Sequence, residues 1–307
     1  MKTSPVTFED LSASVLAVPP LARRDDYRLN KAANEELMRY LERGGVTTLL
    51  YGGNANFYNI SLSEYAEILT TLAETAASES WVIPSAGPSY GMMMDQVEVL
   101  RDYDFPTVMV LPLQAQKTPA GVETGLRRFA ERFGKPIVIY LKFEGYLDVD
   151  GVRRLVKDGV VSGIKYAVVR DDPTRDDYLS SLCDAIDRRY IISGIGERPA
   201  IVHLRDFGLN GFTSGSVCVA PQRSTELLKA LKGQDYDRAE LLRQSFLPLE
   251  DLRDGINPIR VLHDAVTLAG IADMGPILPL MSNLSKDDRE RVAAAARELA
   301  ALDQEVA

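Results

Sequence analysis

Short apolar runs recur along this chain and alternate with longer segments whose apolar residues have helical spacing. Each run is nearly continuous, rich in β-branched residues and bounded by glycine, proline or polar residues. This pattern is typical of parallel strands that are buried on both faces. The predicted strands are 13–18, 46–50, 81–84, 107–111, 137–141, 163–169, 190–192 and 212–219.

The intervening segments complete eight strand–helix units, which predict an α/β fold of the (β/α)8 or TIM barrel type. A doubly wound open sheet is the alternative, but no G-x-G-x-x-G follows the first strand. The strand signals stop after residue 232, where three further helices are predicted. We therefore expect a barrel over 8–232 and a three-helix C-terminal domain over 233–307. The predicted helices are 31–42, one from 61 or 63, 92–103, 121–133, 150–157, 178–188, 199–207, 224–231, 235–249, 258–269 and 285–302.

Composition narrows the classes of function without identifying one. The chain has 307 residues and a net charge of -9, which argues against a nucleic-acid partner or an anionic membrane surface. No apolar run approaches the ~18 residues that a membrane helix needs. The N-terminus lacks the apolar core of a secretory signal, and two cysteines are too few for a disulfide scaffold. We expect a cytoplasmic protein.

Lys165 lies in the middle of the apolar run 160–169. Burial disfavours the charged form of an amine, and a neutral lysine amine can form a Schiff base with a carbonyl substrate. The alternative is a lysine at the edge of a strand that extends its charge to solvent. In a barrel, however, active sites lie at the carboxyl ends of the strands, where this lysine is predicted.

Tyr140 and Lys142 end the fifth predicted strand and are the candidate partners of Lys165. A phenol can carry protons to and from the reacting oxygen, and the two-residue period of a strand puts Lys142 on the same face, nearer the mouth. Lys142 could attract a substrate carboxylate. The alternatives are a core tyrosine and a solvated loop lysine. No histidine–carboxylate cluster has the spacing of metal ligands, so no metal is predicted.

The order of Tyr140 and Gly163-Ile164-Lys165 resembles that of the dihydrodipicolinate synthase / N-acetylneuraminate lyase family. The resemblance extends along nearly the whole chain. It implies a barrel with a C-terminal helical domain, a homotetramer or homodimer, and a class I mechanism without a cofactor. In that mechanism Lys165 would form an imine with pyruvate or another 2-keto acid, and Tyr140 would shuttle protons. Further landmarks are Gly44-Gly45-Val46, Ile60-Ser61, Lys135-Pro136, Val219-Ala220-Pro221, Asn257-Pro258 and Leu278-Pro279-Leu280.

The chain also departs from the family's pattern. The loop after the second strand is typically G-T-T-G-E in the family, and here it begins Gly52-Gly53-Asn54, so both hydroxyl residues are missing. Asn54 and the backbone N–H groups near Gly53 could still bind a carboxylate. The tyrosine that the synthases carry after the fourth strand is missing from 112–115. These losses argue against dihydrodipicolinate synthesis.

Glu197 ends the segment Gly194-Ile195-Gly196-Glu197, which resembles the loop that meets substrate hydroxyls in the sugar-acid lyases. Thr213 and Ser214, at the end of the eighth strand, would add polar contacts to a substrate. The alternative for Glu197 is a carboxylate favoured at the start of a helix by the helix dipole.

Two classes of function follow. The first is a Schiff-base lyase that acts on a 2-keto acid, either as an aldolase or as a dehydratase of a 2-keto-3-deoxy sugar acid. The second is a catalytically weakened barrel that binds a small keto acid in a regulatory role. Retention of both Lys165 and Tyr140 favours the enzyme.

Overall fold

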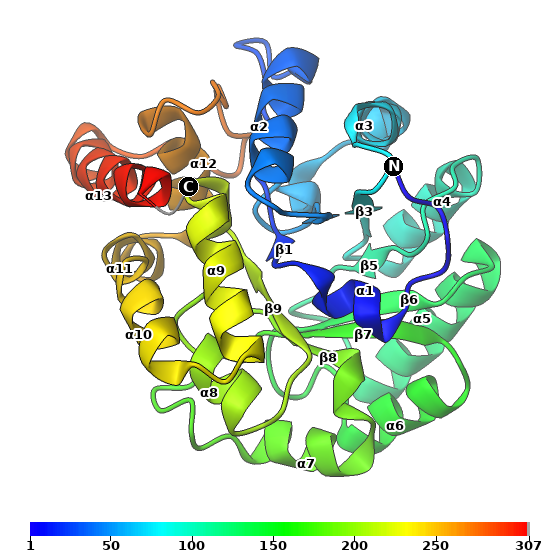
Figure 1. Cartoon of the computed structure of the whole chain (residues 1–307). Coiled ribbons are helices and arrows are strands. Elements are labelled where there is room, and N and C mark those ends of the chain that lie inside the picture. Colours follow the sequence, from blue (N-terminus) through cyan, green and yellow to red (C-terminus); the bar gives the residue numbers. More distant parts are fainter. Residues whose placement is uncertain (306–307) are drawn as a thin grey trace.

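The computed structural model describes residues 1–305, in which parallel strands form a barrel enclosed by helices (Figure 1). Nine strands pair in the order β3-β2-β1-β9-β8-β7-β6-β5-β4, and the pairings are all parallel. The predicted (β/α)8 barrel with a C-terminal helical extension is confirmed. The strands are β1 Leu16–Ala17, β2 Thr48–Leu50, β3 Trp81–Ile83, β4 Ser85–Ala86, β5 Met109–Val110, β6 Ile137–Leu141, β7 Val161–Tyr166, β8 Ile191–Ser193 and β9 Gly211–Ser214.

Nine strands fill eight barrel positions because the third barrel strand is divided at Pro84, and its second part, Ser85–Ala86, lies beyond the predicted strand 81–84. The part before this proline, β3, pairs with β2, and the part after it, β4, pairs with β5. Proline has no backbone N–H to donate to a strand ladder, so the pairing is interrupted at this residue. The two halves stand at opposite ends of the strand order, and the covalent chain between them closes the barrel.

The barrel helices follow the predicted order with small shifts at their ends. The first predicted strand begins later than expected, because residues Phe8–Ala13 form a helix that starts with a reciprocal capping box between Thr7 and Asp10. The Leu11 side chain of this helix packs next to Gly163 and clusters with Leu16 and Ile192, so the helix covers the amino-terminal end of the barrel. The helices are α1 Phe8–Ala13, α2 Lys31–Arg43, α3 Leu62–Thr75, α4 Tyr90–Leu100, α5 Pro119–Phe133, α6 Val149–Lys157, α7 Asp177–Ala185, α8 Ala200–Arg205 and α9 Pro221–Lys232, with 3-10 turns η1 Phe57–Asn59, η2 Arg188–Tyr190 and η3 Ser216–Cys218.

The C-terminal extension contains four helices within residues 1–305, whereas the sequence predicted three. The segment expected to be one helix over 235–249 is divided into α10 (Tyr236–Gln244) and α11 (Leu247–Gly255). Pro248 explains the division, since its ring and its missing N–H are tolerated only in the first turn of a helix. The extension continues with α12 (Pro258–Leu268) and α13 (Lys286–Gln304).

The extension packs on the barrel through its own apolar cluster. Val219 and Ala220, between β9 and α9, lie in the same cluster as Phe246 and Val292 of the extension. In Figure 1, α10 to α13 stand beside α9 on one side of the barrel. No helix in residues 1–305 is long and apolar enough to span a membrane.

The Phe246 side chain, which is fully buried, should anchor the extension. We expect Phe246→Ala to lower the free energy of unfolding by roughly 3–5 kcal/mol, because it removes buried apolar surface and leaves a cavity. Leu241→Ala, on the exposed side of α10 with 69% of Leu241 exposed, is the matched control and should change stability by less than about 0.5 kcal/mol. Urea unfolding followed by circular dichroism measures both, and equal losses would contradict this assignment.

Candidate active site

Lys165 and Tyr140 face each other across neighbouring strands. They are register partners on β7 and β6, and partners on adjacent parallel strands point to the same face. The next residue, Tyr166, points the other way and donates a hydrogen bond to Asp176 outside the barrel, at 2.6 Å. Lys165 and Tyr140 therefore point into the barrel, where the Lys165 Nζ lies 4.6 Å from the centre of the Tyr140 ring.

Burial shifts the pKa values of both groups. Lys165 is 5% exposed and Tyr140 is 8% exposed. Desolvation, then the positive charges of Lys142 and Arg253, lower the pKa of Lys165 to about 7. Desolvation raises the pKa of Tyr140 to about 12. Near neutral pH a large share of the lysine amine is unprotonated, while the phenol keeps its proton. This pair can therefore supply a nucleophile and a proton donor.

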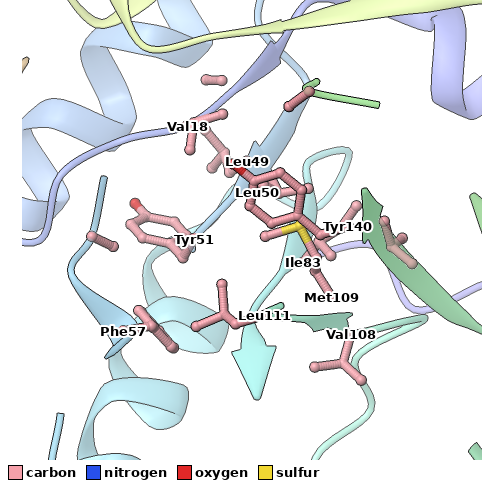
Figure 2. Close-up of a cluster of buried hydrophobic side chains, with 14 of the residues drawn as sticks. Val18, Leu49, Leu50, Tyr51, Phe57, Ile83, Val108, Met109, Leu111 and Tyr140 are labelled. Carbon is pink, nitrogen blue, oxygen red and sulfur yellow. The ribbon is translucent and has the colours of Figure 1, made fainter. Parts of the chain in front are cut away.

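The Tyr140 ring lies in the main apolar core. Figure 2 shows it among side chains from other strands of the barrel, including Leu50, Ile83 and Met109, which belong to the same buried cluster. These apolar neighbours explain why the phenol is desolvated. They also fix the ring, because a closely packed core leaves few alternative rotamers.

Lys142 follows Tyr140 by two residues, and its side chain stays exposed at the mouth. Its Nζ lies 5.6 Å from the centre of the Tyr58 ring. Neighbouring protein atoms displace part of the water around the ammonium and lower its pKa. Within residues 1–305 no carboxylate forms a salt bridge with Lys142. The ammonium is thus available to an anionic ligand.

The loop after β2 carries the predicted residues Gly53 and Asn54. Asn54 Nδ2 donates a hydrogen bond to the carbonyl oxygen of Val18 at 3.0 Å, which ties the loop to the end of β1. In the described part of the chain, the backbone N–H groups of Gly53 and Asn54 have no protein partner. The amide side chain of Asn54 is thus engaged structurally, and the backbone donors are the groups left for a ligand carboxylate.

Glu197 and Ser214 contact each other. Glu197 is fully buried, and its two carboxylate oxygens accept hydrogen bonds from Ser214 Oγ at 2.8 Å and Ser224 Oγ at 2.7 Å. The structure therefore gives both side chains internal partners instead of directing them to solvent at the mouth. Thr213 is 1% exposed on β9, and its carbonyl oxygen accepts a hydrogen bond from the Gly196 N–H at 3.1 Å.

Arg253 and Tyr58 are two site neighbours that sequence reasoning missed. Arg253 belongs to α11 and lies beyond the single helix predicted over 235–249, and its charge acts on Lys165 from outside the barrel. Tyr58 packs on the glycine loop, where a Cβ on Gly53 would be 3.9 Å from Tyr58 Cε2. The spacing of Glu250 and Arg253, three residues apart on one helix, was the available signal for an ion pair.

A large groove on the protein does not coincide with Lys165 and Tyr140. A groove of about 800 Å³ lies outside the barrel, lined mainly by α4, α5 and the loop before α5, and it includes neither Lys165 nor Tyr140. The described residues contain no group of three or more His, Cys, Asp or Glu side chains that could hold a metal ion. His203 bonds Ser193 Oγ, and His263 bonds the Gly275 carbonyl oxygen.

Known proteins with similar sequences place these residues in a family context. The sequence model of the "Dihydrodipicolinate synthetase family" matches residues 13–299. A "Probable 5-dehydro-4-deoxyglucarate dehydratase" of Acinetobacter baumannii is 20% identical over 92% of this chain and 94% of its own length. A "4-hydroxy-tetrahydrodipicolinate synthase" of Methanosarcina barkeri is 24% identical over 91% of this chain and 95% of its own.

Solved structures give the same fold. A dihydrodipicolinate synthase from Bacillus clausii superposes with a TM-score of 0.83 at 22% identity, covering 94% of this chain and 98% of that one. A family protein from Escherichia coli K12, solved in complex with pyruvate, superposes with a TM-score of 0.81 at 19% identity, covering 93% and 98%.

Lys165→Met should stabilise the protein near neutral pH. The pKa of Lys165 is about 7 in the folded state and 10.5 as its ordinary value, so the unfolded chain binds more protons between these two pH values. The stability of the wild type therefore rises with pH across this window, and at pH 7 the substitution should add roughly 2–4 kcal/mol. Urea unfolding at pH 7 and near pH 10 checks both the gain and its decline. Lys142→Met, at the exposed lysine, is the control, and an equal gain there would contradict the role of burial.

Proposed function

Because this chain belongs to the dihydrodipicolinate synthetase family, we propose that it is a Schiff-base-forming lyase that acts on pyruvate or another 2-keto acid. Lys165 is the proposed nucleophile. The observation that carries the proposal is the buried Lys165 amine, with its lowered pKa, beside the Tyr140 phenol. In this chemistry the lysine itself supplies the covalent intermediate, and no separate cofactor is required.

The proposed first stage forms the imine. The lone pair of Lys165 Nζ attacks the ketone carbon, a C–N bond forms as the C=O π bond opens, and the ketone oxygen takes up a proton while the nitrogen gives one up. A second proton on that oxygen lets it leave as water, and the C=N bond remains. The Tyr140 phenol is the proposed proton carrier, because its pKa of about 12 keeps it protonated at neutral pH.

The imine then leads to either of two reactions. Loss of a proton from C3 gives an enamine, whose electrons can expel a hydroxyl from C4, and this is dehydration. The alternative is aldol cleavage. The hydroxyl on C4 loses its proton, the C3–C4 bond breaks, and the electrons of that bond move toward the imine, which gives the same enamine. The dehydratase names of several relatives support dehydration of a keto-deoxy sugar acid.

Substrate anions have two proposed positions. The N–H groups of Gly53 and Asn54, which have no protein partner within residues 1–305, suit the carboxylate beside the ketone, and the Lys142 ammonium suits a second anionic group farther from it. The internal hydrogen bonds of Glu197 and Ser214 do not support the predicted contact with substrate hydroxyls. A role for Thr213 and a homotetramer or homodimer stay predictions.

The borohydride trap tests the nucleophile. Incubation with pyruvate and borohydride should add to the protein the mass of one pyruvate minus one oxygen atom, since water is lost and the C=N bond is reduced. Peptide mapping should place the adduct on Lys165, and Lys165→Ala should show none. An adduct that persists in Lys165→Ala would refute the assignment. Binding of pyruvate without any adduct would favour the regulatory alternative.

A screen of 2-keto-3-deoxy sugar acids decides between the two reactions. Each acid is incubated with the enzyme, and mass spectrometry distinguishes a product that has lost water from released pyruvate. Tyr140→Phe should lower kcat by roughly 100-fold or more, because the proton carrier is lost while the ring packing is kept. Unchanged turnover in this variant would move the proton-transfer role to another group.

A further inference from the structure

A buried ion pair packs against segment 194–196, the segment that the Lys165 stem also approaches. Arg253 Nη1 donates a hydrogen bond to Glu250 Oε1 at 3.1 Å, and Glu250 and Arg253 are 0% and 6% exposed. The same Glu250 oxygen accepts a hydrogen bond from the backbone N–H of Glu197 at 3.0 Å. The hydrogen bond between Glu250 and Glu197 therefore connects helix α11 of the extension to the loop that follows β8.

Gly194 and Gly196 have no side chains, so Lys165 and the Glu250–Arg253 pair can each pack closely against the backbone of this loop. A Cβ on Gly194 would be 2.9 Å from Lys165 Cγ, and a Cβ on Gly196 would be 2.6 Å from Arg253 Nη1. Gly196 also has a φ of +95°, which favours glycine. Lys165 therefore lies against segment 194–196 at Gly194, and the Glu250–Arg253 pair lies against it at Gly196.

Two carboxyl groups hold the guanidinium of Arg253 in place. Its Nη1 bonds Glu250, and its Nε bonds Asp254 Oδ1 at 2.9 Å. Burial and the neighbouring Glu197 disfavour the charged form of Glu250 and raise its pKa to about 8. Its other oxygen, Oε2, is buried and has no partner in residues 1–305. Because a pKa of about 8 leaves much of Glu250 protonated at neutral pH, Glu250 offsets the arginine charge incompletely.

The charged and titratable groups near Lys165 lie on the strand end beside it and across the loop after β8, where Glu250 and Glu197 accompany Arg253. Tyr140 and Lys142 face it from β6 and its end, and Arg253 faces it from α11. Both cations disfavour a proton on the Lys165 amine, in addition to the effect of burial.

We propose that Arg253 is a positioning residue for Lys165: paired with Glu250, it holds segment 194–196 against the lysine stem and places a fixed positive charge behind the amine. This inference rests on the proposed Schiff-base function. It makes the C-terminal extension part of the nucleophile's environment, although no side chain of the extension need touch the substrate.

The pH dependence of imine trapping tests this role. The rate of the pyruvate–borohydride adduct on Lys165 is measured between about pH 6 and about pH 9 for the wild type, Arg253→Met and Arg253→Lys. Loss of the cation in Arg253→Met should move the midpoint upward by roughly half a pH unit or more, because the amine then keeps its proton more readily. Arg253→Lys keeps the charge and should restore most of the wild-type midpoint.

Two further variants separate charge from folding. Arg198→Met removes a nearby arginine that pairs with Asp251 and Asp254, and its midpoint should stay at the wild-type value. If Arg253→Met does not fold because Glu250 loses its counter-charge, the double variant Glu250→Gln/Arg253→Met is compared with Glu250→Gln, so that only the cation differs between the two proteins. A midpoint that stays at the wild-type value when Arg253 is lost would overturn the inference. A wild type that forms no adduct would instead overturn the proposed function.

Discussion

The removal of one lysine amine from water is the constraint on which the candidate site depends. Desolvation is the largest cause of the lowered pKa of Lys165, ahead of the charges of Lys142 and Arg253. A lysine that burial keeps partly neutral is reactive but works against stability, since its unfolded form is better solvated. The closed barrel supplies the rigid apolar surroundings that hold the amine in this state. The packing of Tyr140 in the main core belongs to the same arrangement.

The parts of the fold that depend on local pattern could be predicted from the sequence. Strands buried on both faces produce continuous apolar runs, and the barrel follows from their regular alternation with helices. Lys165 was recognisable because a charged residue is unexpected in such a run. The interruptions that single prolines cause in strands and helices were harder to predict. Pro84 divides a strand and Pro248 divides a helix, and apolar periodicity alone does not distinguish a break from a short irregularity.

The orientation of Glu197 illustrates what local pattern could not provide. Its position after a strand suggested a side chain at the mouth. Its actual partners are Ser214 and Ser224, on β9 and α9, and its backbone N–H bonds Glu250 of the extension. A buried carboxylate needs hydrogen-bond donors, and here its two donors come from two separate elements, β9 and α9. Only the tertiary structure brings these donors together, so sequence spacing gave no indication of them.

The two cations near Lys165 have different surroundings, and this difference suggests a division of roles. Arg253 is buried, with carboxylates on both sides, so its charge is fixed and its donors are occupied. Lys142 is exposed at the mouth and forms no salt bridge within residues 1–305. Both charges favour the neutral amine, but only Lys142 has donors free for an anion. If an anionic substrate binds Lys142, it offsets that charge, and Arg253 still disfavours a proton on Lys165. In the proposed enzyme, an internal cation would thus keep the nucleophile reactive while the external one binds substrate.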